Sequence, residues 1–319
     1  MRGGSRIIYD SMYIMKEWIL EIRENIIMFF RNYGKIIAIS ILFFIGGVML
    51  YQIIILLTPQ KLRVSFLDIG QGDSILIQTP SGHTMLVDGG PTNKILEKLS
   101  KQLNYFDNDI DVIVATHPDA DHVTGLIPVL EKYNVHTVVI SKAESITGVF
   151  ADLTKHIEDE SADVRVAEIN DEIDFHDGVI ATILYPPKNY TEKFIGKKND
   201  TNDASVSMEI KFGNDTFLLT GDLPSTEEGK LIIAGLDKNI TVYKAGHHGS
   251  KSSNGELLLK YSKPEYAVIS AGKDNRYGHP NPEALERLQK YSKEILSTIT
   301  HGTISFITDG RLMEVETEK

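Results

Sequence analysis

The feature that most constrains the fold is an uncharged stretch of 23 residues, Ile36–Thr58, which divides the chain into two unlike parts. At about 1.5 Å of rise per residue, a helix of this length crosses a hydrocarbon layer of about 30 Å. Residues 1–35 carry a net charge of +2 and the whole chain carries −11, so the remainder carries −13. We therefore predict an amphipathic juxtamembrane segment over 1–35, one transmembrane helix over 36–58, and a separate domain over 61–319.

Two other interpretations of this stretch are less consistent with the sequence. A cleaved signal peptide has a shorter apolar core and small residues before its cleavage site, whereas this stretch ends in IIILLTPQ. A buried core helix of this length normally shows a polar face. Positive residues are slightly more numerous before the stretch than after it, which favours a single pass through the cell membrane with the large domain extracellular. These residues are Arg23, Arg31 and Lys35 before it, and Lys61 and Arg63 after it.

Composition restricts the class of the large domain. Of the 319 residues, 42% are hydrophobic and 24% are charged, as in ordinary globular proteins, and none is cysteine. Structural disulfides and thiolate metal sites are therefore excluded. The net charge of −11 also argues against a general nucleic-acid coat protein, whose many phosphate contacts require a broad basic surface.

From Leu62 onward, short strand-like runs alternate with amphipathic helical segments. Two groups of three strands joined by tight turns predict antiparallel meanders over 62–90 and 179–222. Each meander is followed by alternating strands and helices. Two mixed sheets packed face to face, with helices outside, account for this order, so we predict an α/β (α+β) fold, a four-layer αββα sandwich. Helices are expected over 123–132, 148–160, 225–235, 254–262 and 282–292.

The segment Thr116–His122 reads THPDADH and follows the apolar strand DVIVA. Four of its seven residues bear imidazole or carboxylate groups, which are ligands that zinc and manganese prefer. Because a strand-to-helix turn points neighbouring side chains in different directions, this segment suits two metal ions. The alternative is an acidic turn in which Asp119 or Asp121 caps a helix. The four residues are His117, Asp119, Asp121 and His122.

Two further strand ends carry similar residues beside glycine. Gly221–Asp222 follows the strand DTFLLT, and Gly246–Ser250 reads GHHGS after the strand ITVYKA. Five of the ten histidines lie in such loops, a grouping that histidines scattered through a core would not show. We expect hydrolysis by two metal ions about 3.5–4 Å apart, with Asp222 between them, attack by metal-bound hydroxide and Asp121 as a proton shuttle. The five histidines are His117, His122, His247, His248 and His279.

Seven motifs in this order strongly resemble those of the metallo-β-lactamase-fold domain of ComEC-type DNA-uptake (competence) proteins. The resemblance runs from about Leu62 to the carboxyl end. It implies the metallo-β-lactamase sandwich, a dinuclear metallohydrolase and, for that group, a nuclease that degrades one DNA strand during uptake. The motifs are DIGQGDS (Asp68–Ser74), VDGG (Val87–Gly90), HPDADH (His117–His122), NDAS (Asn202–Ser205), LTGD (Leu219–Asp222), HHGS (His247–Ser250) and YGHPNP (Tyr277–Pro282).

The resemblance implies a set of metal ligands. His117 and Asp119 would bind one ion, Asp121 and His122 would bind the other, and Asp222 would bridge the two. Asp119 stands where many members of the superfamily have histidine, which makes its site richer in oxygen and increases the preference for manganese over zinc.

The resemblance leaves two ligand positions open. His248 best matches the last ligand of the second ion, while His247 either takes that role or contacts the substrate phosphate. Many members of the superfamily have another histidine where this chain has Asn202–Asp203. Asp203 either replaces that ligand or caps the turn before the next strand.

Other motif residues are expected to support the metal ions or the substrate. Asp68, Asp73 and Asp88 lie in glycine-rich turns, where they would orient metal-binding groups through hydrogen bonds. His279 precedes the helix predicted over 282–292, and it either acts on the phosphate, as a general acid or a hydrogen-bond donor, or caps that helix.

Basic residues close to the motifs suit an anionic phosphodiester. Near the motifs they are Lys244, Lys251, Lys273 and Arg276, accompanied by the hydroxyl of Ser250. The loop 188–201 is either a second basic surface with aromatic residues for stacking on bases, or an ordinary solvated loop. Its residues of interest are Lys188, Tyr190, Lys193, Phe194, Lys197 and Lys198.

The sequence thus predicts a membrane-anchored, metal-dependent phosphodiesterase or nuclease that acts on DNA with two zinc or manganese ions. Its expected partners are DNA, the membrane through residues 36–58, and a membrane channel in another chain, because one span cannot form a channel itself. No nucleotide cofactor is expected. The alternatives are a phosphoesterase that acts on surface polymers, similar to phosphorylcholine esterases, and a non-catalytic metal-stabilised binding module.

Overall fold

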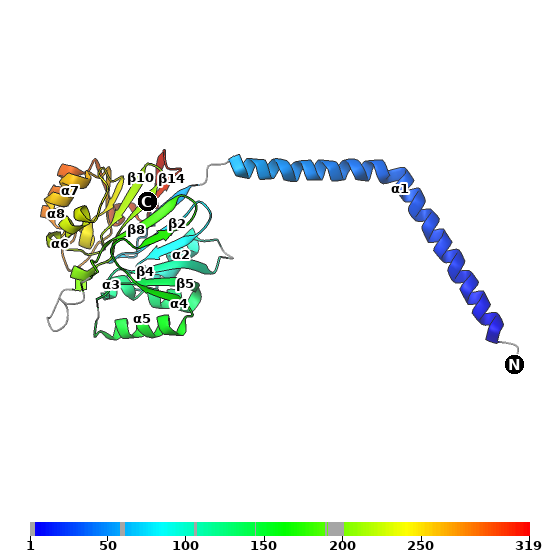
Figure 1. The fold of residues 1–319 in the computed structure, drawn as a ribbon, viewed down its shortest axis with the longest axis horizontal. Helices are drawn as coiled ribbons and strands as arrows, with labels where there is room; N and C mark the ends of the chain where they lie inside the picture. Colours follow the sequence, from blue (N-terminus) through cyan, green and yellow to red (C-terminus); the bar gives the residue numbers. More distant parts are fainter. Residues whose placement is uncertain (1–3, 58–60, 105–106, 144, 189, 191–200) are drawn as a thin grey trace. The chain divides into compact units, whose positions relative to one another are not determined.

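The computed structural model describes residues 4–57, 61–104, 107–143, 145–188, 190 and 201–319. The chain divides into two compact units, Met1–Pro59 and Gln60–Lys319. Helix α1, Gly4–Leu57, is the described part of the first unit (Figure 1). Its segment Met15–Ile53 is long and apolar enough to cross a membrane. The predicted span at 36–58 lies in the carboxyl-terminal half of this helix, except for residue 58, which is outside the described residues.

The described part of the second unit contains two mixed β-sheets. The first has eight strands in the order β15-β14-β1-β2-β3-β4-β5-β6, and the second has seven in the order β13-β12-β11-β10-β9-β8-β7. The strands of the first sheet are β1 Leu62–Phe66, β2 Ile75–Gln78, β3 Thr84–Val87, β4 Asp109–Ala115, β5 Asn134–Ile140, β6 Asp163–Val166, β14 Ile304–Thr308 and β15 Met313–Thr317. Those of the second are β7 Glu172–Asp174, β8 Val179–Tyr185, β9 Ser207–Phe212, β10 Asp215–Leu219, β11 Val242–Lys244, β12 Tyr266–Ile269 and β13 Glu294–Ser297.

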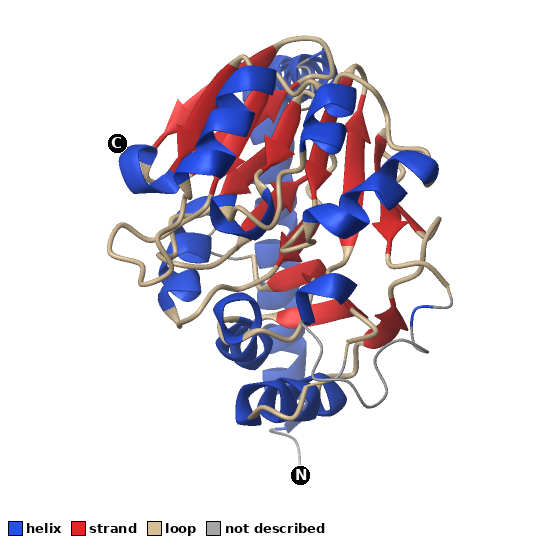
Figure 2. Cartoon of the chain, turned by 90° about the vertical axis from the view of Figure 1, so that its left-hand side faces the viewer, coloured by secondary structure: helices blue, strands red, loops and turns tan. Residues whose placement is uncertain are grey.

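Helices cover the outer faces of both sheets (Figures 1 and 2). Apolar residues of the first sheet pack with α2, α4 and α5, and those of the second pack with α6, α7 and α8. The helices of this unit are α2 Lys94–Gln102, α3 Ala120–Val123, α4 Leu126–Lys132, α5 Gly148–Asp159, α6 Ser225–Ile233, α7 Glu256–Ser262, α8 Pro282–Tyr291 and α9 Thr298–His301, with 3₁₀ turns η2 Thr201–Ala204 and η3 Gly246–Gly249.

A central core joins the inner faces of the two sheets. Phe306 of β14 packs edge to face against Phe217 of β10, with ring centroids 6.2 Å apart. Phe66 of β1 packs against the same Phe306 at 5.9 Å. Since β14 and β10 belong to different sheets, the contact between Phe306 and Phe217 shows two sheets packed face to face, and the predicted αββα sandwich is confirmed.

The predicted local pattern is confirmed where the sequence signal is strong. Strands β1, β2 and β3 pair antiparallel, as do β8, β9 and β10. The sequence pattern does not predict α2, because its nine residues KILEKLSKQ contain only three apolar side chains. The helix predicted over 123–132 is instead two helices, α3 and α4, that meet at Gly125. A Cβ at Gly125 would lie 1.9 Å from the carbonyl oxygen of Gly89, so the loop after β3 can pack directly on this junction.

Candidate metal centre

The predicted site residues meet at one edge of the sandwich, because the strands that precede them end there. Three loops supply them: His117–His122 after β4, Gly221–Asp222 after β10, and η3 after β11. Loops held by the ends of packed strands can present side chains with little freedom of movement. The strand-end arrangement expected from the sequence is therefore present.

Asp222 lies at the centre of this cluster and is 3% exposed. Its Oδ1 lies 3.4 Å from Nε2 of His122. Its Oδ2 lies 3.5 Å from Nε2 of His247, 3.7 Å from Nε2 of His248 and 3.8 Å from Nε2 of His117. One buried carboxylate thus faces four imidazoles, the arrangement expected of a bridging ligand.

Several atoms that face the centre have no hydrogen-bond partner among the described residues. Nε2 of His117, His122 and His248 and Oδ1 of Asp222 are all buried and unpaired. Leaving such atoms without partners costs about 1–3 kcal/mol each. Four unpaired atoms that converge on one region instead match the donor set of a divalent metal ion, and the residues present fit such an ion. Atoms of Asp73, His122, Asp222 and His248 also lie within 4.8 Å of one another.

The outer nitrogens of two histidines are held by carboxylates. Nδ1 of His122 lies 2.7 Å from Oδ2 of Asp88, which also accepts a hydrogen bond from the Thr116 hydroxyl at 2.7 Å. Nδ1 of His248 lies 3.1 Å from Oδ1 of Asp73. A proton held on Nδ1 leaves the lone pair of Nε2 facing the centre. Asp73 and Asp88 therefore occupy positions from which they can orient metal ligands.

The two aspartates of the HPDADH motif face different histidines. Oδ2 of Asp119 lies 3.8 Å from Nε2 of His117. Oδ2 of Asp121 lies 3.4 Å from Nε2 of His248. The hydroxyl of Thr201, at the start of η2, donates to Asp119. Thr201 is not predicted from the sequence, because no local pattern shows that the loop before β9 contacts the HPDADH turn.

The HHGS loop has an unusual backbone that other residues hold in place. His247 and His248 both have positive φ, of 49° and 55°. This region disfavours residues other than glycine and costs of the order of 1–3 kcal/mol for each residue. Asn254 supports the loop: its Oδ1 accepts from the Gly246 amide at 2.9 Å, and its Nδ2 donates to the Gly246 carbonyl at 3.0 Å. The buried Glu228 accepts from the Asn254 amide at 2.6 Å, which ties the loop to α6.

The electrostatics of the cluster favour bound positive charge. Burial, reinforced by the neighbouring His122, lowers the pKa of His117 to about 4. Burial also opposes a charge on His248, but Asp222 and Asp73 outweigh it and raise the pKa of His248 to about 9. In the same way, Asp222 and Asp88 overcome burial and raise the pKa of His122 well above its ordinary value. The buried carboxylates therefore retain protons on neighbouring imidazoles, and divalent ions would supply the same positive charge.

A pocket opens from the cluster to solvent. Its wall includes Gln71 of the DIGQGDS motif and two residues of the YGHPNP motif, Tyr277 and His279. Gln71 is not predicted from the sequence as a site residue. The ring of His279 lies 5.5 Å from that of His247. Burial, with the neighbouring His247 and His248, lowers the pKa of His279. The other residues of the wall are Asp119, Asp121, Asp222, His247 and His248.

Two sequence predictions require correction. Lys244 does not face the substrate: it is fully buried, and its Nζ lies 2.7 Å from Oδ2 of Asp73. The ionic partners of Asp68 among the described residues are Lys94 and Lys319, at 3.6 Å and 3.4 Å, so this carboxylate binds surface lysines and not a histidine. Asp203 lies on η2, where its carbonyl accepts from the Tyr185 hydroxyl, and the role of its carboxylate stays a prediction.

The residues predicted to bind substrate are mostly accessible. Lys251, Lys273 and Arg276 are exposed, and Arg276 lines a second hollow beside the pocket. Ser250 is buried, and its hydroxyl pairs with that of Ser252 at 2.9 Å. In the loop 188–201, Tyr190 is buried against Tyr185. Lys193, Phe194, Lys197 and Lys198 lie outside the described residues, and the carbonyl of Lys188 accepts from Lys142.

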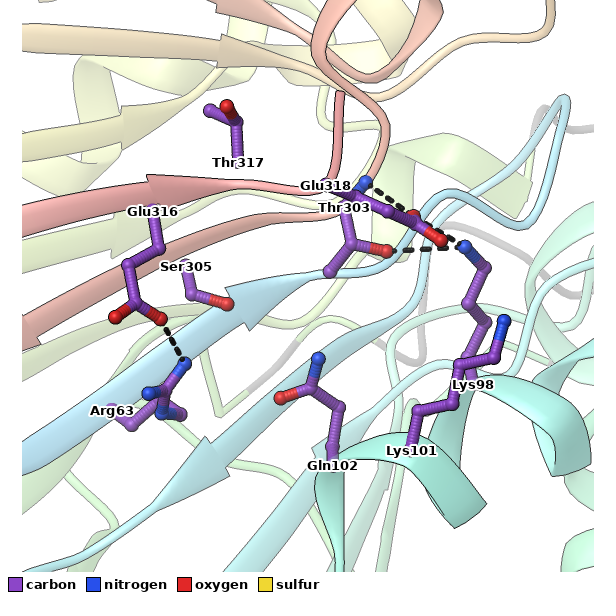
Figure 3. Close-up of a pocket in the computed structure, with 9 residues that line it drawn as sticks. All are labelled: Arg63, Lys98, Lys101, Gln102, Thr303, Ser305, Glu316, Thr317 and Glu318. Atoms are coloured by element: carbon purple, nitrogen blue, oxygen red, sulfur yellow. Dashed lines mark hydrogen bonds and ion pairs between the residues drawn. The ribbon is translucent and has the colours of Figure 1, made fainter.

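Another pocket lies beside α2, over β1, β14 and β15, and is also lined by charged residues (Figure 3). Its charges are paired with one another. Nζ of Lys98 lies 2.6 Å from Oε2 of Glu318, and Arg63 lies 3.0 Å from Glu316. Lys101 pairs with Glu97 on the same helix. This pocket therefore lacks the converging unpaired atoms of the first.

Comparisons with known proteins agree with this geometry. Residues 67–189 match the Metallo-beta-lactamase superfamily. The chain is 28% identical to ComE operon protein 3 of Bacillus subtilis over 263 residues, which cover 76% of this chain and 33% of that protein. It is also 28% identical to Competence protein ComA of Neisseria gonorrhoeae over 245 residues, covering 76% and 32% of the two chains. The chain thus spans about a third of the length of these curated relatives.

The metallo-beta-lactamase fold protein YhfI from Bacillus subtilis superimposes with a TM-score of 0.48 and 12% sequence identity, over 76% of this chain and 98% of that one.

Proposed function

Since residues 61–319 contain a metallo-beta-lactamase domain related to the competence proteins, we propose that this chain is a membrane-anchored phosphodiesterase that hydrolyses DNA with two divalent metal ions. The observation that supports this most directly is the convergence of four buried, unpaired ligand atoms on one region. Bound ions would polarise a phosphate and provide a nucleophile from water near neutral pH. Side chains of this chain would hold the ions, contact the phosphate and transfer protons.

In this proposal the ligands divide into two groups around Asp222. His117 and Asp119 hold one ion, and Asp121, His122 and His248 hold the other. His248 is assigned over His247 because its Nε2 is buried, unpaired and 3.4 Å from Asp121. The His247 side chain is 27% exposed and lies on the pocket wall, where it suits contact with a phosphate oxygen. The sites take zinc or manganese, and the oxygen-rich first site favours manganese.

Two groups are positioned to serve the leaving group and the phosphate. The Asp121 carboxylate is partly exposed at the pocket wall, from which it can pass a proton to solvent. His279 has a buried Nδ1 with no hydrogen-bond partner among the described residues. Because its pKa is lowered, His279 is a neutral imidazole near pH 7, and it is suited to hydrogen bonding with the substrate more than to donating a proton.

DNA is the substrate that the surroundings support best. The exposed Arg276 lines the hollow beside the pocket, and the exposed Lys251 and Lys273 follow the HHGS motif and Gly272 in the sequence, so these side chains can neutralise a phosphate backbone. The relatives named as competence proteins are consistent with such a substrate. With α1 as the anchor, we place the catalytic domain on the extracellular side, beside a membrane channel formed by another chain. Protection of the domain from protease added to intact cells would contradict this orientation.

The test uses the full chain, purified in detergent, stripped of metal with a chelator and reloaded with manganese or zinc. Single-stranded DNA, duplex DNA and single-stranded RNA are offered to the wild type, to Asp222→Asn and to His248→Ala. Asp159→Asn serves as a matched control, because Asp159 is an exposed carboxylate at the end of α5. We expect metal-dependent cleavage of DNA that falls by at least about 10³-fold in Asp222→Asn and is unchanged in the control.

Metal content provides a second readout. His248→Ala should lose one of two bound ions, whereas His247→Ala should retain both and lose affinity for the substrate. A folded wild-type protein that binds two ions and cleaves no polynucleotide would refute the DNA proposal. A folded protein that binds no divalent ion would refute the metal centre itself.

A further inference from the structure

A second hollow adjoins the metal pocket and shares three of its residues. Gln71, Asp121 and Tyr277 line both, so the two form one continuous surface beside the centre. The other residues of the hollow are Pro91, Asn275 and Arg276. A polymer with a phosphate at the metals must place its neighbouring nucleotide somewhere along such a surface.

Tyr277 offers an accessible aromatic surface in this hollow. The residue is 54% exposed, and its ring stacks on that of His279 with a centroid distance of 5.9 Å and an angle of 14°. The Arg276 guanidinium lies 5.0 Å from the ring centroid, and its Nη2 donates to the Tyr277 hydroxyl at 2.9 Å. We call Arg276 and Tyr277 together the Tyr277 platform. Proteins that bind single-stranded nucleic acids use accessible aromatic side chains as surfaces on which bases stack.

The platform is held rigidly by hydrogen bonds within its own loop. Oδ1 of Asn275 accepts from the amide of Tyr277 at 3.2 Å and from that of His279 at 2.9 Å. Nδ2 of Asn275 donates to the carbonyls of Gly272 and His279. The loop is also tied to the first sheet, because Oε1 of Gln71 accepts from the Gly272 amide at 3.1 Å. A surface fixed before binding loses little conformational entropy when a ligand stacks on it.

Gln71 adds an unsatisfied donor between the platform and the metals. While its Oε1 is occupied by Gly272, its Nε2 is buried and has no hydrogen-bond partner among the described residues. A buried amide N–H₂ without an acceptor is unfavourable, so an acceptor from a ligand would complete its hydrogen bonding. A phosphate oxygen at the centre, or an oxygen of the adjacent nucleotide, has the required chemistry.

We infer that the hollow is a nucleotide subsite in which an unpaired base next to the scissile phosphate stacks on the Tyr277 platform while Gln71 donates to the phosphate. This inference rests on the proposed function and makes it specific. Because the face of a base is covered in a duplex, only a single strand or a frayed end can use the platform. The positive charge of Arg276 beside the ring favours an anionic nucleotide and disfavours a quaternary ammonium such as choline.

The test compares Tyr277→Ala with Tyr277→Phe in the full, metal-loaded chain. The substrates are oligothymidylate and the same oligonucleotide with abasic residues, which keeps the phosphates and removes the bases. We expect KM for oligothymidylate to rise roughly ten- to hundredfold in Tyr277→Ala and to change little in Tyr277→Phe, which keeps the ring. The rise in KM for Tyr277→Ala should be much smaller with the abasic strand, which has no base to stack. Gln71→Met should slow the cleavage of both strands equally, because its contact is with the phosphate.

Binding to a variant that cannot cleave separates this inference from the proposed function. In an Asp222→Asn background, anisotropy of labelled oligothymidylate should show weaker binding in Tyr277→Ala and no change for the abasic strand. If the wild type cleaves no polynucleotide but binding still depends on Tyr277, the phosphodiesterase proposal fails and the subsite stands. If Tyr277→Ala cleaves and binds oligothymidylate as the wild type does, or if abasic and ordinary strands behave alike, the subsite is refuted and the phosphodiesterase stands.

Discussion

The metal pocket and the pocket beside α2 both gather charged side chains, but they neutralise them in opposite ways. In the pocket beside α2, each charge has a partner of opposite sign, as in the pair Lys98–Glu318. In the metal pocket, His117, His122 and Asp222 turn unpaired atoms toward one region. A set of paired charges is complete without a ligand, whereas the unpaired atoms gain partners only when something binds. The difference indicates function more reliably than the number of charges in either pocket.

A fully buried ion pair supports one of the histidines of the metal pocket from beneath. Lys244 and Asp73 are almost completely inaccessible, and Asp73 holds His248. Lys98 is also buried, but the side chain of its partner Glu318 is 37% exposed. Water can therefore solvate the charge that a broken ion pair leaves beside α2, but it cannot reach a charge left beneath the metal centre. We therefore expect removal of the lysine to lower the free energy of unfolding more in the buried pair than in the pair beside α2.

The largest effect is expected for Lys244→Met. The substitution leaves the buried Asp73 carboxylate without its lysine partner and with His248 as its remaining ionic neighbour, which should lower the free energy of unfolding by about 3–5 kcal/mol. Denaturant unfolding of the metal-free chain measures this directly. The double variant Lys244→Met/Asp73→Asn should recover part of the loss, because no buried charge then remains unpaired. Lys290→Met, which breaks an exposed pair with Glu256, is the control and should leave the free energy of unfolding nearly unchanged. Equal costs for the two single variants would contradict the proposed difference between buried and exposed pairs.

Metal removal should have the next largest effect. If the unpaired atoms bind divalent ions, free metal at about 100 times its dissociation constant adds about 3 kcal/mol to the stability of the folded state. For a domain of this size that corresponds to a rise of roughly 6–12 °C in Tm. Calorimetry of the chelated and reloaded chain measures it, and the rise should be smaller in His122→Ala, which removes a ligand of one of the two ions. A rise of the same size in that variant would place the ions elsewhere.

How far the sequence predicts this arrangement depends on whether the signal is local. The alternation of strands and glycine turns predicts both sheets, and the strand-end rule brings together His117, Asp222 and His248. The same rule wrongly predicts that Lys244, the last residue of β11, faces the substrate. Lys244 is instead paired with Asp73, in a loop of the other sheet. Gln71 is missed because its significance lies in an unpaired Nε2, which requires the positions of all its neighbours. Local pattern thus predicts which groups gather, and only the three-dimensional packing shows which of them lack a partner.

A pH-dependent effect is expected from Glu228, which supports the HHGS loop. Burial raises the pKa of this carboxyl to about 7, although hydrogen bonds from Gly255 and Asn254 partly oppose the shift. The folded state therefore holds a proton that the unfolded state releases near pH 4.5. Stability from this group is full below pH 4.5 and declines as the pH rises from there through about 7, by roughly 3 kcal/mol in total.

Unfolding of the chelated chain between pH 5 and pH 8 tests this sign. Glu228→Gln cannot ionise and should remove that part of the decline, whereas Glu283→Gln, at an exposed position of α8, should leave it unchanged. A steeper decline in Glu228→Gln would mean that the ionised carboxylate is the form that the loop amides stabilise.

The smallest effect is expected at the pocket beside α2. Lys98→Met keeps the apolar stem and leaves Glu318 in contact with water, so the free energy of unfolding should fall by about 1 kcal/mol. Lys101→Met, which lies on the same helix and breaks an exposed pair with Glu97, should lower the free energy of unfolding less than Lys98→Met does. Neither substitution should change metal content or cleavage. A loss of cleavage in Lys98→Met with normal stability would show that the paired pocket also takes a ligand, and the contrast between the two pockets would then fail as a guide to function.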